Sequence, residues 1–328
     1  MSAPRWRSAA GLVGYLVWAI ATAGVCAHFV GLTSTVVAWF AAFTPVGVVL
    51  SVIALVLLLI GGRRRAAVAA TVVLLVGIGT QVPLYRSSAP PELSGPSVRV
   101  MQANIRLGGA DAAALVDSVG AREIDVLTVI ELTDSARAKL AAAGLENALP
   151  HNCVRTRHGG GGAGIYSRYP LRECAQLDGF VLNNLRAVAE IPAADPTAVY
   201  ALHPLPPYPE PAWKWVYELK RLRPIFSAEP YPMIVGADFN ATYDHRQYRQ
   251  LLTNSTPHGV APLLDAAEHV GAGVVPTYPA DRVLPPVLAI DRILTREWVP
   301  TTFARLELPG SDHLGVTSNL RLPGMNSN

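Results

Sequence analysis

The first quarter of the chain is almost free of charge. Between Ala9 and Leu84 the only charged residues are three consecutive arginines, Arg63 to Arg65. A bilayer core requires ~20 apolar residues for each helical crossing. We therefore expect three transmembrane helices, over residues 9–30, 35–60 and 66–84. A cleaved signal peptide would account for the first of these segments but not for the two behind it.

The basic residues around these segments predict how they are oriented. Arg5 and Arg7 precede the first segment and the three arginines separate the second from the third, whereas residues 31–34 contain no Lys or Arg. Cytoplasmic loops carry the excess of Lys and Arg, so we expect the amino terminus and the arginine turn in the cytoplasm. The third segment then places everything after about residue 86 outside. A transporter is not favoured, because the segments contain no acidic residue of the kind that lines a permeation path.

The chain divides into three predicted regions: a membrane anchor over residues 1–86, a linker rich in Pro and Ser over residues 87–97, and one domain over residues 98–328. All 24 Asp and Glu lie after residue 86, as do all but six of the 27 Lys and Arg. The domain is therefore about neutral. A nucleic-acid-binding domain usually displays a basic field, so nucleic acid is the less favoured partner.

Apolar and periodic runs predict an alternation of strands and helices in this domain. We expect strands over residues 98–104, 126–130, 152–155, 164–167, 187–191, 198–203, 233–238, 288–294 and 314–322. Helices are expected over residues 110–122, 134–143 and 211–226. Such mixing indicates a layered α/β or α+β sandwich.

Polar residues recur where these strands end. Asp238 and Asn240 follow an apolar run, and alternation along an extended chain places them on one side, with Phe239 packed on the other. Taken alone, such an Asp and Asn can simply form a turn. The same recurrence is seen at Asn104, Glu131, His203, Asp291 and the sequence Ser311-Asp312-His313.

The motifs around these residues resemble the endonuclease/exonuclease/phosphatase superfamily. They are Gln102-Ala-Asn-Ile-Arg106, Val129-Ile-Glu-Leu132, Gly162-Ala-Gly-Ile-Tyr-Ser-Arg-Tyr-Pro-Leu171, Leu202-His203, Gly236-Ala-Asp-Phe-Asn-Ala-Thr242, Ile290-Asp-Arg-Ile-Leu294 and Gly310-Ser-Asp-His313. Each motif is weak by itself, but they occur in the family's order. The resemblance implies a four-layer α/β/β/α sandwich and a metal-dependent phosphoester hydrolase.

The resemblance also implies roles for individual residues. Glu131 would be the principal ligand of Mg²⁺, with Mn²⁺ as the alternative, because a carboxylate oxygen suits a hard cation. Asn104 and Asp312 would assist at the metal. Arg106 stands where other members carry a second acid, and would contact phosphate.

The remaining polar residues would carry out the hydrolysis. By the resemblance, Asp238 orients or deprotonates the attacking water, and Asn240 holds a phosphoryl oxygen. His313 is oriented by Asp291, since a carboxylate bonded to one ring nitrogen fixes the tautomer. His203 would donate to phosphate or to the leaving oxygen. Which group is the base is left open by the sequence.

Two further features leave alternatives open. Cys153 and Cys174, both in the exported domain, form a disulfide or remain two buried thiols. A Pro-rich loop after His203 leads into a segment in which Trp213, Trp215 and Tyr217 alternate with basic residues. These aromatic side chains either pack into the domain or contact a membrane interface.

Together these features predict a multi-pass membrane protein with an extracytoplasmic, Mg²⁺-dependent phosphoesterase domain. Its substrate would be a phosphodiester of a lipid headgroup or of another cell-envelope component. The alternatives are an extracellular nuclease and a catalytically silent binding module. The silent module predicts that catalytic groups are missing, and the sequence lacks none of them.

Overall fold

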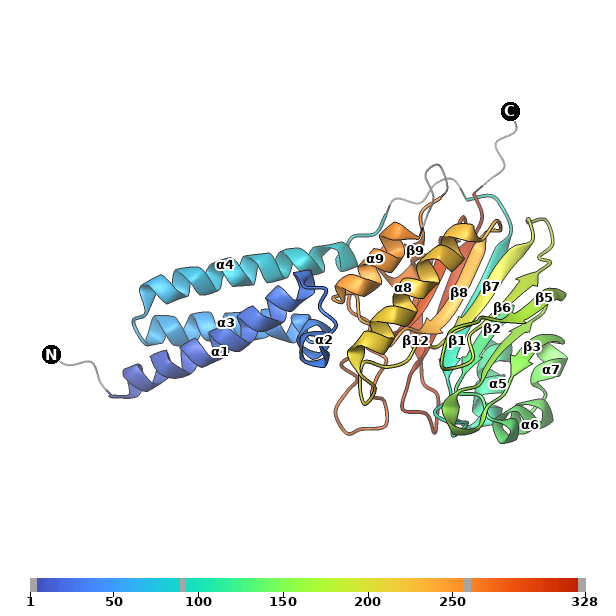
Figure 1. Cartoon of the computed structure of the whole chain (residues 1–328), viewed down its shortest axis with the longest axis horizontal. Coiled ribbons are helices and arrows are strands. Elements are labelled where there is room, and N and C mark those ends of the chain that lie inside the picture. The colour runs from blue at the N-terminus through green and yellow to red at the C-terminus, as the bar shows by residue number, and fades with distance from the viewer. Residues whose placement is uncertain (1–4, 89–92, 256–260, 324–328) are drawn as a thin grey trace, which may run out of the picture.

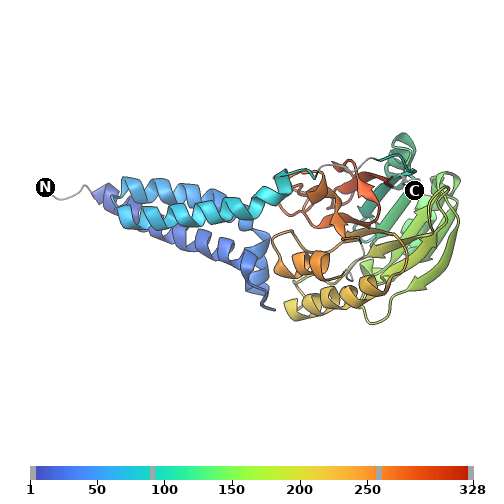
Figure 2. The same cartoon turned by 90° about the horizontal axis from the view of Figure 1, so that it is seen from above.

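The computed structural model describes residues 5–88, 93–255 and 261–323, which form a helical bundle and a two-sheet domain side by side (Figures 1 and 2). The predicted linker therefore lies partly outside the described residues, as do residues 256–260 and 324–328 of the predicted domain.

The bundle contains α1 (Arg5–Phe29), α3 (Thr44–Ile60) and α4 (Arg64–Gln81), and α4 continues into the short helix η1 (Val82–Tyr85). α1 and the α4–η1 segment are each long and apolar enough to cross a membrane. Large apolar side chains on these helices face outward: Leu12, Leu16, Val49, Val68, Val72 and Leu75. Apolar residues on an exposed helix surface suit contact with lipid rather than water.

The second predicted segment is not one helix. It is divided into α2 (Thr35–Ala42) and α3, which are bent by 69° relative to each other. The break lies at Phe43, and Pro45 occupies the first turn of α3. Proline fits the first turn of a helix but disrupts a helix interior, so the chain ends one helix and begins another here.

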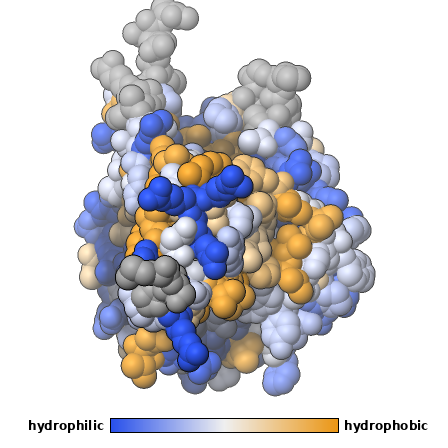
Figure 3. Space-filling model, turned by 90° about the vertical axis from the view of Figure 1, so that its left-hand side faces the viewer, coloured by the Kyte–Doolittle hydropathy of each residue, from blue (hydrophilic) through white to orange (hydrophobic). Residues whose placement is uncertain are grey.

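The arginine-rich turn lies at the end of the bundle that is remote from the domain (Figure 1). Arg7 Nε donates to the carbonyl oxygen of Ile60 at 3.0 Å, which ties the start of α1 to the end of α3. Figure 3 looks onto this end and shows hydrophilic side chains among hydrophobic ones. Both groups of arginines expected on one membrane side thus lie at one end of the bundle.

The domain consists of two sheets. The first has the order β11-β13-β1-β2-β4-β3, with β12 paired to β13, and the second has the order β5-β6-β7-β8-β10-β9. The strands of the first sheet are β1 (Ser97–Asn104), β2 (Val126–Ile130), β3 (His151–Arg155), β4 (Ala163–Ser167), β11 (Val299–Pro300), β12 (Ala304–Leu306) and β13 (Gly315–Arg321). Those of the second are β5 (Leu171–Gln176), β6 (Leu185–Ala189), β7 (Thr197–Leu202), β8 (Met233–Asp238), β9 (Leu264–Asp265) and β10 (Asp291–Arg296). Each sheet contains one parallel pair, β1–β2 and β7–β8.

Helices cover the outer face of each sheet, so the predicted two-sheet sandwich is confirmed. α5 (Ala112–Ala121), α6 (Asp134–Ala142) and α7 (Leu145–Ala148) pack on the first sheet, and α8 (Ala212–Ala228) and α9 (Arg246–Asn254) pack on the second, with α10 (Ala266–His269) at its edge. A third apolar cluster fills the space between the sheets. Gly236 permits their close approach, because a Cβ atom there would lie 1.9 Å from Thr128 Oγ1.

A disulfide between Cys153 and Cys174 joins the two sheets, with their Cα atoms 5.6 Å apart. Cys153 lies on β3 and Cys174 on β5, which are edge strands of different sheets. The structure therefore favours the paired alternative over two free thiols.

Several predicted strands are shifted or were missed. β6 begins two residues before the predicted 187–191 run, and β10 begins at Asp291 rather than at residue 288. β5 was missed because most of its side chains are exposed or half-buried, so it lacks an apolar run. α9 was missed as well, although its amphipathic pattern buries Tyr248 and Leu251.

Candidate active site

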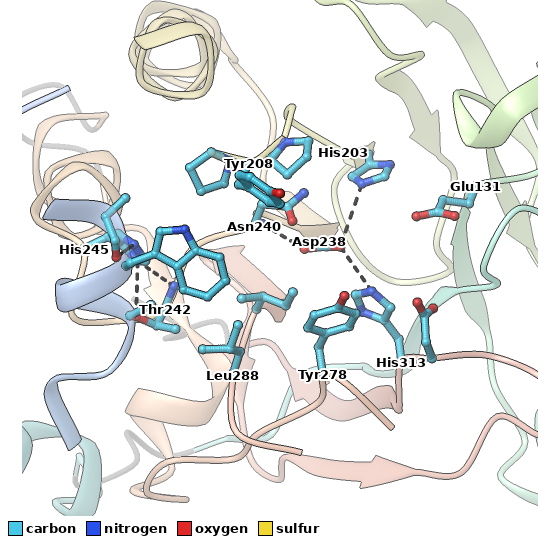
Figure 4. Close-up of a pocket in the computed structure, with 17 residues that line it drawn as sticks. Glu131, His203, Tyr208, Asp238, Asn240, Thr242, His245, Tyr278, Leu288 and His313 are labelled. Carbon is cyan, nitrogen blue, oxygen red and sulfur yellow. Dashed lines mark hydrogen bonds and ion pairs between the residues drawn. The ribbon is translucent and has the colours of Figure 1, made fainter. Parts of the chain in front are cut away.

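The predicted site residues meet at one end of the sandwich. Asn104 ends β1, Glu131 follows β2, His203 follows β7 and Asp238 ends β8. Parallel neighbours present their carboxyl ends at the same edge of a sheet, and β10 runs antiparallel so that Asp291 pairs directly with Asp238. The loop before β13 adds Asp312 and His313. Figure 4 shows Glu131, His203, Asp238 and His313 converging from these elements.

Six predicted residues line a cavity of about 300 Å³: Glu131, His203, Asp238, Asn240, Asp312 and His313. Asn104 and Asp291 are buried next to this group. Arg106 is exposed and does not line the cavity. It pairs instead with Asp281, at 3.1 Å, and with Asp312, at 3.8 Å.

Asn104 connects the acidic residues of the site. Its Nδ2 atom donates to Glu131 Oε1 at 3.0 Å and to Asp238 Oδ2 at 3.2 Å, and lies 3.4 Å from His313 Nε2. Its oxygen accepts from the backbone nitrogen of Arg106 at 3.0 Å. In this arrangement the amide nitrogen, not the oxygen, faces Glu131. Asn104 therefore acts as a donor that holds two carboxylates in place, and its role as a metal ligand stays a prediction.

His313 is oriented by Asp291, not left free to rotate. The distance from His313 Nδ1 to Asp291 Oδ2 is 2.8 Å, and both side chains are buried. Burial lowers the pKa of His313, but the charge and hydrogen bond of Asp291 outweigh it and raise the pKa to about 10. His313 is therefore a cation at neutral pH. The ring of Tyr278 packs against it, with centroids 4.7 Å apart.

Asp238 lies between the two histidines. Its Oδ2 atom is 3.8 Å from the Nε2 atoms of both His203 and His313, and its Oδ1 accepts from the backbone nitrogen of Asn240 at 2.8 Å. Burial, reinforced by the charge of Asp291, raises the pKa of Asp238 to about 7. Burial lowers the pKa of His203. A carboxylate with a pKa near 7 suits general base catalysis at neutral pH.

The donor atoms fit a hard divalent cation. Glu131 is half-buried at the cavity wall, and its Oε2 is fixed by the backbone nitrogen of Leu107 at 2.7 Å. One carboxylate oxygen each from Asp238 and Asp291 lie within 4.8 Å of each other, and Asp291 Oδ1 is buried with no hydrogen-bond partner among the described residues. Carboxylate oxygens are preferred by Mg²⁺ and Mn²⁺.

The backbone around the site is strained. Eight non-glycine residues of the described chain have positive φ, and four of them lie here: Arg106, Leu107, Glu131 and Asn240. Left-handed backbone costs a non-glycine residue about 1 kcal/mol or more and is retained where the surrounding contacts enforce it. At Glu131 and Asn240 this conformation turns the chain directly after a strand, so that both residues line the cavity.

Sequence reasoning missed several residues of the site. Asn184 is fully buried, and its Oδ1 accepts from the backbone nitrogen of His203 at 2.7 Å. Ser311 accepts from the backbone nitrogen of His313 and donates to the carbonyl of Asn104. Ser311 could have been found because it directly precedes Asp312 and His313, whereas no local pattern marks Asn184.

One wall of the cavity was also missed. It is formed by Ala38, Trp39 and Ala42 of α2, together with the Pro-rich loop at residues 206–208 and with Leu288 and Ile290. The blue ribbon of the N-terminal segment passes beside His245 in Figure 4. The cavity thus has a polar end at the strand termini and an apolar end at the helical bundle.

Comparisons with known proteins agree with this geometry. The model of the Endonuclease/Exonuclease/phosphatase family matches residues 101–313, about two thirds of the chain. Comparison with curated proteins gave no match.

Among solved structures, a humanized TDP2 of D. rerio is 16% identical, with a TM-score of 0.56, and the match covers 69% of this chain and 99% of that one. D. rerio TDP2 complexed with single strand DNA product is 17% identical, with a TM-score of 0.55 and coverages of 69% and 99%. An endonuclease/exonuclease/phosphatase from Beutenbergia cavernae is 19% identical, with a TM-score of 0.51 and coverages of 70% and 72%. At these identities the likeness shows a shared fold.

Proposed function

Because the chain belongs to the endonuclease/exonuclease/phosphatase family, whose members are typically metal-dependent hydrolases of phosphoesters, we propose that it is a membrane-anchored, metal-dependent phosphodiesterase. The observation that carries the proposal is the cluster around Asn104. One amide nitrogen lies within 3.4 Å of Glu131, Asp238 and His313, which come from three separate segments of the chain. A silent binding module has no need for such a cluster, nor for the left-handed backbone at Glu131 that turns its carboxylate into the cavity.

Each side chain of the cavity has a separate role in the proposed hydrolysis. Asp238, with a pKa of about 7, accepts a proton from the attacking water. His313, held as a cation by Asp291, stabilises charge that develops on a phosphoryl oxygen. Asn240 donates one amide hydrogen to the carbonyl of Pro204 at 3.1 Å, and the other is available to a phosphoryl oxygen. We assign the donation to the leaving oxygen to His203, whose Nε2 lies 3.8 Å from Asp238 Oδ2.

Glu131, with Asp312 in the same cavity, would hold the divalent cation. When bound, Mg²⁺ or Mn²⁺ neutralises phosphoryl charge and polarises the phosphorus–oxygen bond. Arg106, which pairs with the cavity residue Asp312, would attract the anionic substrate, since its side chain is exposed.

The helical bundle supports a substrate in the membrane or the cell envelope. We assign residues 1–86 as the anchor, 87–97 as the linker and 98–328 as the hydrolase domain. The arginines lie at the end of the bundle remote from the domain, and the positive-inside rule then places the domain on the extracytoplasmic side. The disulfide between Cys153 and Cys174 suits an oxidising compartment.

The test uses the full chain in lipid nanodiscs with Mg²⁺ or Mn²⁺. Its substrates are bis-p-nitrophenyl phosphate, p-nitrophenyl phosphate, plasmid DNA and a phospholipid. We expect metal-dependent hydrolysis of the diester and the phospholipid, and no activity in Glu131→Ala or His313→Ala. Glu307→Ala and His151→Ala, away from the cavity, are the matched controls. Activity that needs no metal, or that survives in Glu131→Ala, would contradict the mechanism.

Plasmid DNA tests the nuclease alternative. A nuclease should prefer plasmid to both the diester and the phospholipid, and its affinity should fall steeply as the salt concentration rises. Preference for plasmid with that salt dependence would replace the lipid substrate by nucleic acid.

A further inference from the structure

The anchor forms part of the active site and does more than tether it. α2 contributes three residues to the wall of the catalytic cavity, Ala38, Trp39 and Ala42. Ala38 is 5% exposed and belongs to the same apolar cluster as Trp215 and Phe239 of the domain. α2 is therefore packed as a structural element of the hydrolase domain, although it lies within the predicted anchor.

Polar contacts fix α2 in this position. His245 Nδ1 accepts from the backbone nitrogen of Thr242, so its Nε2 carries the proton and donates to the carbonyl of Ala38 at 3.0 Å. Burial lowers the pKa of His245 to about 4, so the ring stays neutral. Thr35 Oγ1 donates to the carbonyl of Pro207 at 3.3 Å.

Contacts from α1 and α4 hold the rest of the bundle against the same part of the domain. Asp244 Oδ1 lies 2.7 Å from His28 Nδ1 of α1 and accepts from Gln81 Nε2 of α4 at 2.8 Å. Arg249 donates to the carbonyl of His28 at 2.5 Å. The residues from Thr242 to Arg249 thus contact α1, α2 and α4.

An apolar groove shares one lining residue, Trp39, with the catalytic cavity. It has a volume of about 210 Å³ and is lined entirely by apolar residues of α1, α2, α3 and the turn between the last two: Ile20, Gly24, Trp39, Phe40, Phe43, Val46, Gly47 and Leu50. Gly24 and Gly47 let α1 and α3 approach closely beside it, since a Cβ on Gly47 would lie only 3.3 Å from the carbonyl of Ala21.

Trp39 is common to the cavity and the groove. Its ring stacks on that of Phe43 of the groove, with centroids 5.9 Å apart and planes 7° apart. It also meets the ring of Tyr208 of the cavity edge-on, with centroids 6.2 Å apart. A row of three aromatic rings therefore leads from the phosphoester site to the groove among the helices.

We propose that the substrate is a membrane lipid whose phosphoester occupies the catalytic cavity while its hydrocarbon chain lies in the groove lined by Ile20, Phe43 and Leu50. This inference rests on the proposed function and names its substrate class. A lipid chain in the groove and its phosphoester in the cavity would meet at Trp39, which lines both. Since lipid tails are as apolar as the groove, the groove orients the lipid rather than extracting it.

Hydrolysis of phosphodiesters with alkyl chains of different length tests whether a hydrocarbon chain occupies the groove. Ethyl and dodecyl p-nitrophenyl phosphate release the same chromophore and differ in the alkyl chain. In the full chain in nanodiscs we expect kcat/KM for the dodecyl ester to exceed that for the ethyl ester by about tenfold or more. Ile20→Trp, which fills the groove, should reduce that ratio about fivefold or more. Leu16→Trp, one turn earlier on α1 and outside the groove, should keep it within about twofold.

A second measurement does not depend on turnover. A phospholipid with a diazirine in its acyl chain is photolysed in the same nanodiscs, and the attached peptides are mapped. Within residues 20–50, labelling of the groove residues Phe43 and Leu50 relative to the outward-facing Val49 should fall in Ile20→Trp and be retained in both Leu16→Trp and Glu131→Ala. Equal labelling and equal chain-length ratios in the two Trp variants would overturn the inference. If no ester is hydrolysed but the labelling pattern holds, the phosphodiesterase proposal fails and the lipid groove stands.

Discussion

The disulfide between β3 and β5 should account for a large share of the domain's stability. It closes a loop with a sequence separation of 21 between Cys153 and Cys174. In the chain-entropy account, a loop of this length restricts the unfolded state enough to contribute about 3 kcal/mol. The bridge also ties together the edges of two sheets whose inner faces meet mainly through apolar packing. Its loss should therefore loosen the sandwich on the side remote from β9.

The perturbation is the double variant Cys153→Ala/Cys174→Ala, measured by thermal unfolding of the full chain in detergent. For a domain of this size, a loss of about 3 kcal/mol lowers Tm by roughly 6–12 °C. Cys26→Ala, which removes the free cysteine of α1, is the matched control and should leave Tm unchanged. Reductant should lower Tm of the wild type by a similar amount and should not affect the double variant.

Either of two results would refute this reasoning. A double variant that unfolds within about 2 °C of the wild type would show that the bridge does not restrict the unfolded chain. Alkylation of Cys153 and Cys174 in intact cells without prior reduction would show that both thiols are free there, and would place the domain in a reducing compartment.

Three further predictions concern the site, the core and the junction with the bundle. EDTA should abolish diester hydrolysis and Mg²⁺ or Mn²⁺ should restore it, and restoration in Glu131→Gln should need a much higher metal concentration; equal metal requirements would remove Glu131 from the metal site. Glu229→Ala should cost about 1–3 kcal/mol of unfolding free energy, because the half-buried Arg186 guanidinium, 2.6 Å from Glu229 Oε2, loses this partner and keeps only Glu173. Although burial raises the pKa of Glu229, the hydrogen bonds from Arg186 and Tyr200 and the charge of Arg186 together outweigh it and lower the pKa. Ionised Glu229 therefore stabilises the fold fully at pH values above its unfolded-state pKa of about 4.3, and this stabilisation is lost as the pH falls through the lower pKa of the folded state. Urea unfolding curves of wild type and Glu229→Gln should therefore differ at pH 7 and converge in acid. His245→Ala should lower lipid hydrolysis more than hydrolysis of bis-p-nitrophenyl phosphate, because it frees the carbonyl of Ala38; an equal loss on both substrates would show that His245 supports the fold alone.

The part of the fold that the sequence predicts well is the part with a local signature. β8 spans Met233–Asp238 as predicted, because an apolar run ends at residues suited to turns. The polar residues at strand ends meet as expected, since β1 and β2 are parallel and so are β7 and β8. The pairing of Cys153 with Cys174 was open because separation along the chain does not determine distance in space.

The bend after α2 is indicated by a proline, but a hydropathy pattern does not show it. Pro45 marks the start of a new helix, but the residues on both sides are apolar, so the segment reads as one span. The sequence contains no indication that α2 packs against the domain. Ala38 is buried by side chains about 180–200 residues further along the chain, and a small apolar residue carries no local mark of such a partner. The alternatives for the aromatic residues of α8 each hold for part of the set. Trp215 packs into the core, whereas Trp213 and Tyr217 are exposed.

The covering of Trp215 and Phe239 by Ala38 has a practical consequence for anyone who prepares this protein. A fragment that starts after the helices would lack α2, so the apolar cluster that includes Ala38 would be partly uncovered. The catalytic cavity would also open to bulk water on the side that α2 closes. Such a fragment should be prone to self-association through the bared surface. Inhibitor screens run on it would select compounds for a pocket that the intact protein does not possess.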